Sequence, residues 1–101
     1  RGATVTLCHE HTQNIAKHVT AADIVISAIG KPNIIQTDWL NPACIVIDIG
    51  INRLVDGIVG DIDFPSAINR VSKITPVPGG VGPMTVAMLM QNTLLAYDRK
   101  F

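Results

Sequence analysis

The chain alternates short apolar runs with segments in which apolar residues recur at helical spacing. Residues 23–29 and 45–49 are continuous and β-branched, which predicts two strands buried on both faces of a sheet. Threonines alternate with small and apolar residues at 3–8, which predicts an earlier strand, and residues 73–77 are expected to form the last one. Strands separated by helical segments are typical of an α/β fold whose strands run parallel.

Helical spacing predicts most of the segments between these strands. Thr12 is a suitable N-cap for a first helix, because apolar residues then recur from Ile15 to Ala22. Three further segments are expected between the later strands: a short helix at residues 37–40, a polar turn at 53–57, and a helix at 64–71 that begins near Pro65.

A long helix is predicted at residues 83–99. Pro83 fits its first position, where a helix has no use for the missing N–H group. The first half, from Met84 to Met90, has almost no polar face, so we expect that half to be buried. With helices on two sides of the parallel strands, the predicted fold class is α/β, a Rossmann-like three-layer sandwich with a mainly parallel sheet.

Composition bounds the size of the fold and the classes of partner. A chain of 101 residues forms at most one domain. Apolar residues make up 48% and charged residues only 16%, which favours a layered core and a face that meets a partner domain or subunit. The formal net charge is zero, so the chain offers no electrostatic attraction to a nucleic acid or an acidic membrane.

Two further features favour a cytoplasmic protein. Cys8 and Cys44 lie far apart in apolar runs, without the paired spacing of a metal site, and are expected to be buried reduced thiols. No apolar run reaches the length of a membrane span, and no N-terminal signal pattern is present. We therefore expect neither a membrane partner nor a metal.

Every promising loop follows a predicted strand, where ligands bind in a parallel α/β sheet. These loops are residues 8–12, 28–32, 48–52 and 78–83. No G-x-G-x-x-G motif occurs, and no strand precedes Ala3 to carry a phosphate-binding turn. We therefore expect a dinucleotide-binding fold that lacks its first strand and its phosphate loop.

The most distinctive motif is ITPVPGGVGPMT at residues 74–85. Its prolines fix φ and its glycines free the backbone, so bare peptide N–H groups can approach a ligand at the start of a helix. From spacing alone, a binding loop and a rigid turn without a ligand are equally good interpretations.

The same motif, followed by Asn92 and Thr93, resembles the C-terminal signature of the bifunctional methylenetetrahydrofolate dehydrogenase/methenyltetrahydrofolate cyclohydrolases. Four other segments resemble this family in the same order: residues 3–9, 22–32, 46–53 and 60–64. The resemblance spans essentially the whole chain. It implies a partial NAD(P)-binding domain at residues 1–101, with the N-terminal catalytic domain absent from this chain.

The resemblance also implies an activity for the parent enzyme. That enzyme would oxidise 5,10-methylenetetrahydrofolate to the methenyl form with NADP or NAD, and hydrolyse the product to 10-formyltetrahydrofolate. It would be a cytoplasmic homodimer serving one-carbon metabolism and purine biosynthesis. Its partners would be the tetrahydrofolate substrate and its own N-terminal domain.

Particular residues inherit roles from this resemblance. The cofactor side is assigned to His9, Glu10, Thr12, Gly30, Gly50 and Ile51. For Gly30, a role in the turn alone is an equally good interpretation. The substrate side is implied for Pro78, Gly79, Gly80, Val81 and Gly82. The key lysine of the family belongs to a Tyr-x-x-x-Lys pair in the N-terminal domain, and here Phe101 stands four residues after Tyr97. No catalytic residue is therefore assigned, and the chain alone is expected to be inactive.

Several residues keep alternative interpretations. An acidic residue after the second strand accepts hydrogen bonds from the ribose hydroxyls of NAD, whereas the family often carries Ser or Arg there, so Glu10 puts the usual NADP preference in doubt. A solvated loop charge is an equally good interpretation of Glu10, and His11 is expected to be structural or solvated without a functional role. Asp48 is expected to anchor its loop through backbone N–H groups, and Asp61 and Asp63 are expected to be structural.

Two functions outside catalysis also stay open. One is a stand-alone nucleotide-binding or regulatory module. The other is a self-associating domain that pairs through an exposed sheet edge.

Overall fold

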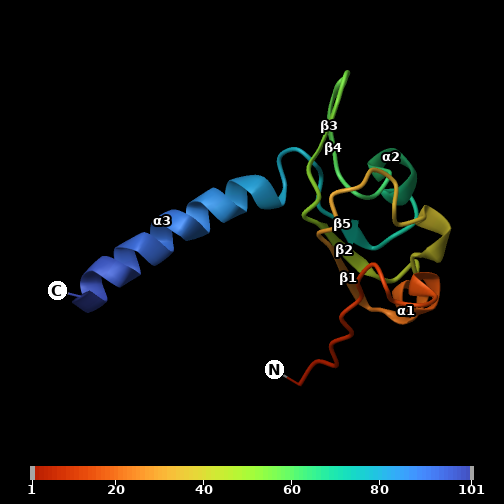
Figure 1. Ribbon diagram of the computed structural model, residues 1–101, viewed down its shortest axis with the longest axis horizontal. Coiled ribbons are helices and arrows are strands. Elements are labelled where there is room, and N and C mark those ends of the chain that lie inside the picture. Colours follow the sequence, from red (N-terminus) through yellow and green to blue (C-terminus); the bar gives the residue numbers. More distant parts are fainter. Residues whose placement is uncertain (1, 101) are drawn as a thin grey trace.

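A three-stranded parallel sheet forms the centre of the computed structural model, which describes residues 2–100. Its order is β1-β2-β5, with β1 at Ile24–Ser27, β2 at Ile45–Asp48 and β5 at Lys73–Ile74 (Figure 1). β1 and β2 pair along their whole length, and β5 pairs with the first half of β2. The α/β class with a mainly parallel sheet is thus confirmed. Phe101 lies outside the described residues.

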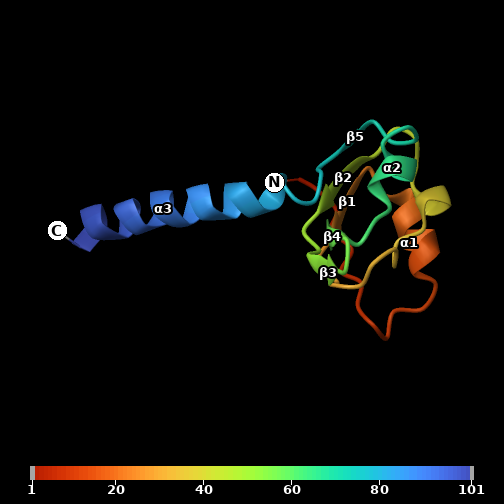
Figure 2. The same ribbon diagram turned by 90° about the horizontal axis from the view of Figure 1, so that it is seen from above.

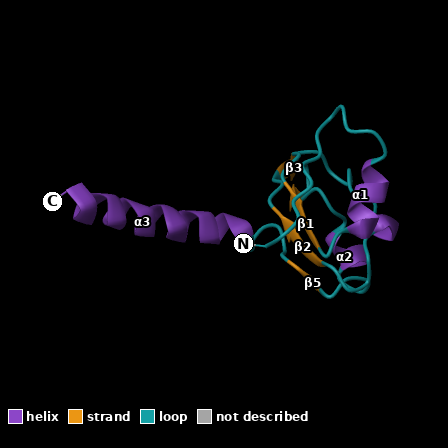
Figure 3. Ribbon diagram, turned by 90° about the horizontal axis from the view of Figure 1, so that it is seen from below, coloured by secondary structure: helices purple, strands orange, loops and turns teal. Residues whose placement is uncertain are grey.

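One face of this sheet is covered by short helices. They are α1 at Ile15–Ala21, the 3₁₀ helix η1 at Thr37–Trp39 and α2 at Phe64–Ala67, and Figures 2 and 3 show them on the same side of the strands. The core between the two layers consists of the buried residues Val19, Val25, Ile35, Leu40, Cys44, Val46, Ile62, Ala67 and Val71. Apolar side chains from strands, helices and loops therefore share one interior.

The other face of the sheet is open in the described part of the chain. Val25 and Val46 are buried, whereas Ile24, Ile26 and Ile45 are exposed. The prediction that both strands are buried on two faces is therefore wrong for these residues. The physical reason is that no described helix packs against that face, since α3 (Val81–Lys100) extends away from it, so residues 2–100 form two of the three expected layers.

Helix α3 spans Val81–Lys100 and extends away from the sheet (Figure 1). It begins two residues before the predicted start, which places Pro83 within its first turn. The expected burial of its first half is wrong, because Met84 is 58% exposed and Met90 is 70% exposed. An α-helix satisfies its hydrogen bonds internally, so α3 is regular although it packs against no layer of the sheet.

The segment at residues 2–8 contains no strand, contrary to prediction. Val5 and Leu7 are 85% and 86% exposed. Strand hydrogen bonds must come from a neighbouring strand, and no described strand lies beside this segment.

The first helix starts later than its predicted cap. Asn14, in a left-handed conformation with φ 54°, is the N-cap, and its side chain accepts a hydrogen bond from the Lys17 N–H. Thr12 instead closes a turn, because its Oγ1 accepts a hydrogen bond of 2.8 Å from the His9 N–H. The helix prediction is confirmed and the cap prediction is wrong.

A β-hairpin replaces the predicted polar turn. β3 at Asn52–Leu54 pairs antiparallel with β4 at Gly57–Val59, and residues 55–56 form the tip. The short helix at η1 and the strand at β5 are confirmed, although β5 is shorter than predicted. α2 begins at Phe64 with Pro65 in its first turn, and it ends at Ala67 rather than at residue 71.

Candidate functional site

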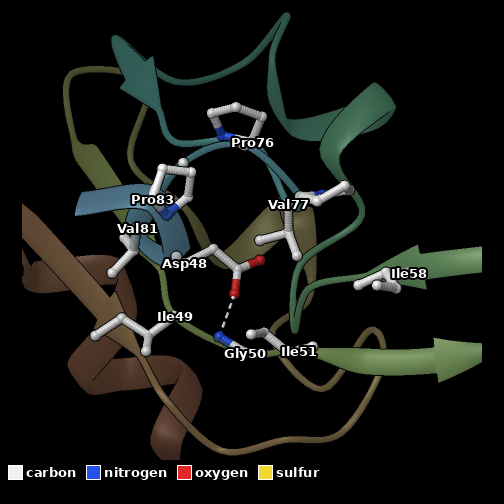
Figure 4. A pocket seen from close by; sticks show the side chains of 13 residues that line it. Asp48, Ile49, Gly50, Ile51, Ile58, Pro76, Val77, Val81 and Pro83 are labelled. Carbon is white, nitrogen blue, oxygen red and sulfur yellow. Dashed lines mark hydrogen bonds between the residues drawn. The ribbon is translucent and has the colours of Figure 1, made fainter. Parts of the chain in front are cut away.

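A cavity of about 200 Å³ opens where β2 and β5 end (Figure 4). It is lined by residues 48–51 from the loop after β2, by Ile58 from the hairpin, and by residues 76–83 from the connection to α3. The carboxyl ends of parallel strands meet at one edge of a sheet, and this brings the two loops together. Two sets of predicted site residues, 50–51 and 78–82, therefore line one pocket.

The connection between β5 and α3 has a backbone that side chains would disturb. The Val77–Pro78 peptide bond is cis, and Gly79 has φ +100°, a conformation that favours glycine. Gly80 packs against the Pro76 carbonyl oxygen in the position that a Cβ would occupy. The shape of this loop therefore depends on glycine at both positions.

The walls of the pocket are mainly apolar. Figure 4 shows the side chains of Ile49, Ile51, Val77 and Val81 around the cavity, with the Asp48 carboxylate at its base. Among the described residues that line it, Asp48 is the only titratable one. The pocket therefore offers an apolar surface with peptide groups, the usual composition of a small-molecule site.

The Asp48 carboxylate is held by three backbone N–H groups. It accepts hydrogen bonds from the N–H groups of Gly50 (3.0 Å), Asp61 (3.1 Å) and Ile62 (3.1 Å). Burial raises the pKa of Asp48 above its ordinary value, and the nearby charge of Asp61 raises it further. The three hydrogen bonds act to lower the pKa but do not outweigh burial. The expectation that Asp48 anchors its loop is confirmed.

Asp61 does not line the pocket and is completely buried. Its carboxylate accepts hydrogen bonds from Ser27 Oγ, from the N–H groups of Ile29, Gly30 and Lys31, and from Asn52 Nδ2. Burial alone would raise the pKa of Asp61, but these donors outweigh it and hold the pKa below its ordinary value. The structural role expected for Asp61 is confirmed. Asp63 is exposed and accepts a hydrogen bond from Ser66.

Each of these aspartates faces a glycine. A Cβ on Gly50 would overlap the Asp61 carboxylate, and a Cβ on Gly60 would overlap the Asp48 carboxylate. The two glycines therefore make room for the two buried charges.

The remaining predicted cofactor residues do not line this pocket. Gly30, with φ +84°, lies in the loop after β1 and donates its N–H to Asp61 at 3.0 Å. His9, Glu10 and Thr12 form a turn before α1, in which Thr12 also donates its N–H to the His9 carbonyl at 2.9 Å. The structure thus places the predicted cofactor residues at three loops, one of which borders the cavity.

Sequence reasoning included Asn52 in a candidate loop without giving its side chain a role, and it missed Ile58. Both belong to the hairpin, and a signal for it was present: Asp56-Gly57 between apolar residues indicates a tight hairpin, although the tip lies one residue earlier, at 55–56. The buried amide of Asn52 carries no such signal, because its partner is nine residues away in sequence.

Metal and membrane features complete the description. Within residues 2–100, no group of three His, Cys, Asp or Glu side chains is placed to hold a metal. No helix in this part of the chain combines the length and apolar character needed to span a bilayer. Cys44 is a buried free thiol whose pKa is raised by burial, and Cys8 is a half-buried free thiol.

Comparison with known proteins gives consistent matches over the whole chain. The profile of the family described as tetrahydrofolate dehydrogenase/cyclohydrolase, NAD(P)-binding domain, matches residues 1–101. The chain is 58% identical over 98 residues to the bifunctional protein FolD of Methylobacillus flagellatus, which covers 96% of this chain and 34% of that protein.

Solved structures agree with these matches. The bifunctional FolD of Campylobacter jejuni is similar with a TM-score of 0.93 at 46% identity, over 99% of this chain and 36% of that one. The Trypanosoma brucei FolD, complexed with NADP and an inhibitor, gives a TM-score of 0.89 at 45% identity, over 97% and 36%. The chain spans about a third of the length of the relatives that it matches.

Proposed function

This chain belongs to the family of tetrahydrofolate dehydrogenase/cyclohydrolase NAD(P)-binding domains, and we propose that its pocket holds the nicotinamide end of NADP or NAD beside a folate. One observation carries this proposal. Residues 50–51, expected on the cofactor side, and residues 78–82, expected on the substrate side, line the same cavity. The parent reaction would be oxidation of 5,10-methylenetetrahydrofolate, followed by hydrolysis of the methenyl product to 10-formyltetrahydrofolate.

The residues present fit such a cofactor. The cavity of about 200 Å³ is smaller than the roughly 300–1,000 Å³ of pockets that enclose whole ligands, so it suits one end of a dinucleotide. Ile49, Ile51 and Val77 offer apolar surface to a flat ring, and the glycine backbone offers peptide groups to its amide. When bound, the nicotinamide supplies the acceptor for a hydride.

The chain's own contribution would be orientation and exclusion of water. The loop at residues 76–83 and the loop at 48–51, which Asp48 anchors, supply two walls of the pocket and would orient the bound ring between them. Both carboxylate oxygens of Asp48 accept backbone N–H groups, so we assign Asp48 to anchoring its loop and not to proton transfer. Proton transfer and hydrolysis would therefore need residues from an N-terminal catalytic domain, and the chain alone would bind without catalysing.

This proposal is tested by binding and by complementation. We would titrate NADP⁺ and NAD⁺ into the 101-residue chain by calorimetry. We would also join the chain to the two thirds of the Methylobacillus relative that it lacks, and assay both reactions. We expect nucleotide binding by the chain and both activities only in the joined protein. A joined protein that hydrolyses methenyltetrahydrofolate but forms no reduced dinucleotide would refute the proposal.

Glu10 is proposed to favour NAD over NADP. The side chains of Glu10 and His11 are both highly exposed, and Glu10 Oε1 lies 3.5 Å from His11 Nε2. The Glu10 carboxylate is therefore accessible to a ribose. Its charge would repel the extra phosphate of NADP. We expect Glu10→Ser to improve NADP binding about two- to fivefold, the scale of an exposed charge interaction, with Asp98→Asn as control. Equal or tighter NADP binding by the unsubstituted protein would contradict this assignment.

Self-association is a second candidate, favoured by a separate observation. β1 lies at the edge of the described sheet, and apolar residues of α3 such as Met90 are exposed. We propose that a homodimer forms through the exposed apolar side chains of α3 and the free edge of β1. Sedimentation at increasing concentration tests it: dimers that still bind nucleotide fit the enzyme, whereas association without any nucleotide affinity favours a non-catalytic assembly domain.

A further inference from the structure

We infer that Asp61 is a positioning residue for the dinucleotide, because its buried carboxylate fixes the loop after β1 against the loop after β2. This inference rests on the proposed function. Asp61 itself would not touch the ligand, since it is completely buried and is not among the residues that line the pocket.

The first half of the argument concerns the loop after β1. Asp61 Oδ2 accepts hydrogen bonds of 2.8 Å from the Ser27 hydroxyl and 2.8 Å from the Ile29 N–H. Its Oδ1 accepts hydrogen bonds from the N–H groups of Gly30 (3.0 Å) and Lys31 (3.1 Å). Three consecutive peptide N–H groups thus converge on one carboxylate and turn the loop inward.

The second half concerns the loop after β2. The Asn52 side chain donates to Asp61 Oδ1 at 3.2 Å. Gly50 packs directly against the Asp61 carboxylate, in the space that a side chain on Gly50 would fill. Because Gly50 and Ile51 line the pocket, the position of Asp61 sets one wall of it.

Asp48 in turn holds Asp61 in place. Asp48 Oδ1 accepts hydrogen bonds from the N–H of Gly50 at 3.0 Å and from the N–H of Asp61 at 3.1 Å. The same carboxylate packs where a side chain on Gly60 would lie. Asp61 is therefore fixed both through its backbone and through its side chain.

This arrangement has a consequence for recognition. Peptide N–H groups in such loops commonly bind the phosphates of a dinucleotide. Here the N–H groups of Ile29, Gly30 and Lys31 are already bound to a buried negative charge. The loop after β1 therefore approaches the cofactor as a shaped surface and not as a phosphate-binding site.

The test uses both reactions of the joined protein described above. Asp61→Asn keeps the size of the side chain but leaves one oxygen for the five donors. We expect the KM for the dinucleotide to rise at least tenfold, while the cyclohydrolase activity, which uses no dinucleotide, changes less than twofold. Asp63→Asn is the matched control, because its exposed carboxylate binds only Ser66 among the described hydrogen bonds, and we expect both activities to be unchanged.

A milder variant covers the case in which Asp61→Asn fails to fold. Ser27→Ala removes one donor to Asp61 and leaves the other four. We expect it to raise the dinucleotide KM two- to fivefold, without loss of cyclohydrolase activity. An unchanged dinucleotide KM, or a proportional fall in both activities, would overturn the inference. Failure of the proposed function would be seen separately, as a lack of dinucleotide reduction before any substitution.

Discussion

Helix α3 and the segment at residues 2–8 both expose large apolar side chains, yet only the helix has regular structure. The hydrogen bonds of α3 join residues within the same element, so its 20 residues need no neighbour to form the backbone ladder. The hydrogen bonds of a strand at residues 2–8 would have to come from an adjacent strand. An element that packs against nothing can therefore be regular when its hydrogen-bond partners lie within the element, as in a helix, but not when they must come from a neighbour, as in a strand.

The loops after β1 and β2 extend the same contrast. They lack regular structure but are held by two buried carboxylates that accept backbone N–H groups. No buried side-chain polar atom in the described residues is without a hydrogen-bond partner. A loop can therefore be fixed by polar contacts in the interior, whereas α3 has a regular backbone and no packed face.

The largest effect on stability is expected when a leucine of the core is replaced, in comparison with a leucine of α3. Leu40 is fully buried and Leu94 is 61% exposed. Leu40→Ala should reduce the free energy of unfolding by about 2–5 kcal/mol, because it opens a cavity. Leu94→Ala should change it by less than about 0.5 kcal/mol. Urea unfolding followed by Trp39 fluorescence measures both, and a comparable loss for Leu94→Ala would show that α3 is packed in solution.

Glycines give the next largest contrast. Gly50→Ala places a Cβ against the Asp61 carboxylate, so we expect a loss of about 1–3 kcal/mol, the usual scale of overpacking. Gly82→Ala meets nothing within 4 Å and should change stability by no more than about 0.5 kcal/mol. Thermal unfolding of the two variants tests the pair. Equal stabilities would contradict the close packing at Gly50.

The two buried aspartates should respond to pH in opposite directions. The lowered pKa of Asp61 contributes stability above the ordinary aspartate pKa, and this is lost as the pH falls through the folded value. The pKa of Asp48 is raised, so Asp48 contributes most to the stability of the fold in acid. This stability is lost as the pH rises through the pKa of Asp48 in the folded protein.

Unfolding at a series of pH values checks these directions. The stability gap between the protein and Asp61→Asn should narrow in acid. The gap for Asp48→Asn should narrow as the pH rises above the ordinary aspartate range. Gaps that move together would show that the two carboxylates are not distinguished by their surroundings.

The smallest effect on global unfolding is expected within α3. Ala87 is exposed, so Ala87→Gly should weaken the helix locally by about 1 kcal/mol. Far-ultraviolet circular dichroism should then show less helix, while the unfolding midpoint reported by Trp39 stays the same. Ala67→Gly, at a fully buried position of α2, is the control and should lower that midpoint. A lower midpoint for Ala87→Gly would mean that α3 unfolds together with the core.

The central strands were predictable because β-branched runs at residues 23–29 and 45–49 leave few alternatives. The hairpin was missed, although Asp56-Gly57 indicated it. The strand at residues 3–8 was predicted wrongly, since its formation depends on a neighbour that its own residues do not specify. In each case local pattern predicted the tendency, and tertiary contacts decided the result.

The candidate site was predictable in a similar way. Residues 50–51 and 78–82 line one cavity because both follow strands of the same sheet. The turn at His9 and Glu10 and the loop at Gly30 do not line it. The convergence of five donors on Asp61 could not be predicted, because Ser27 and Lys31 lie 34 and 30 residues away in sequence.

The pairing of each glycine with a facing aspartate also constrains how this sequence can evolve. A side chain at position 50 needs the space that Asp61 occupies, and one at position 60 needs the space of Asp48. A shorter residue at 61 must therefore be fixed before a larger residue at 50 is tolerated, and the same order applies to 48 and 60. We therefore expect substitutions at these four positions to occur in pairs, with the aspartate replaced before the glycine. A lineage that replaced the glycine first would pass through an overpacked intermediate.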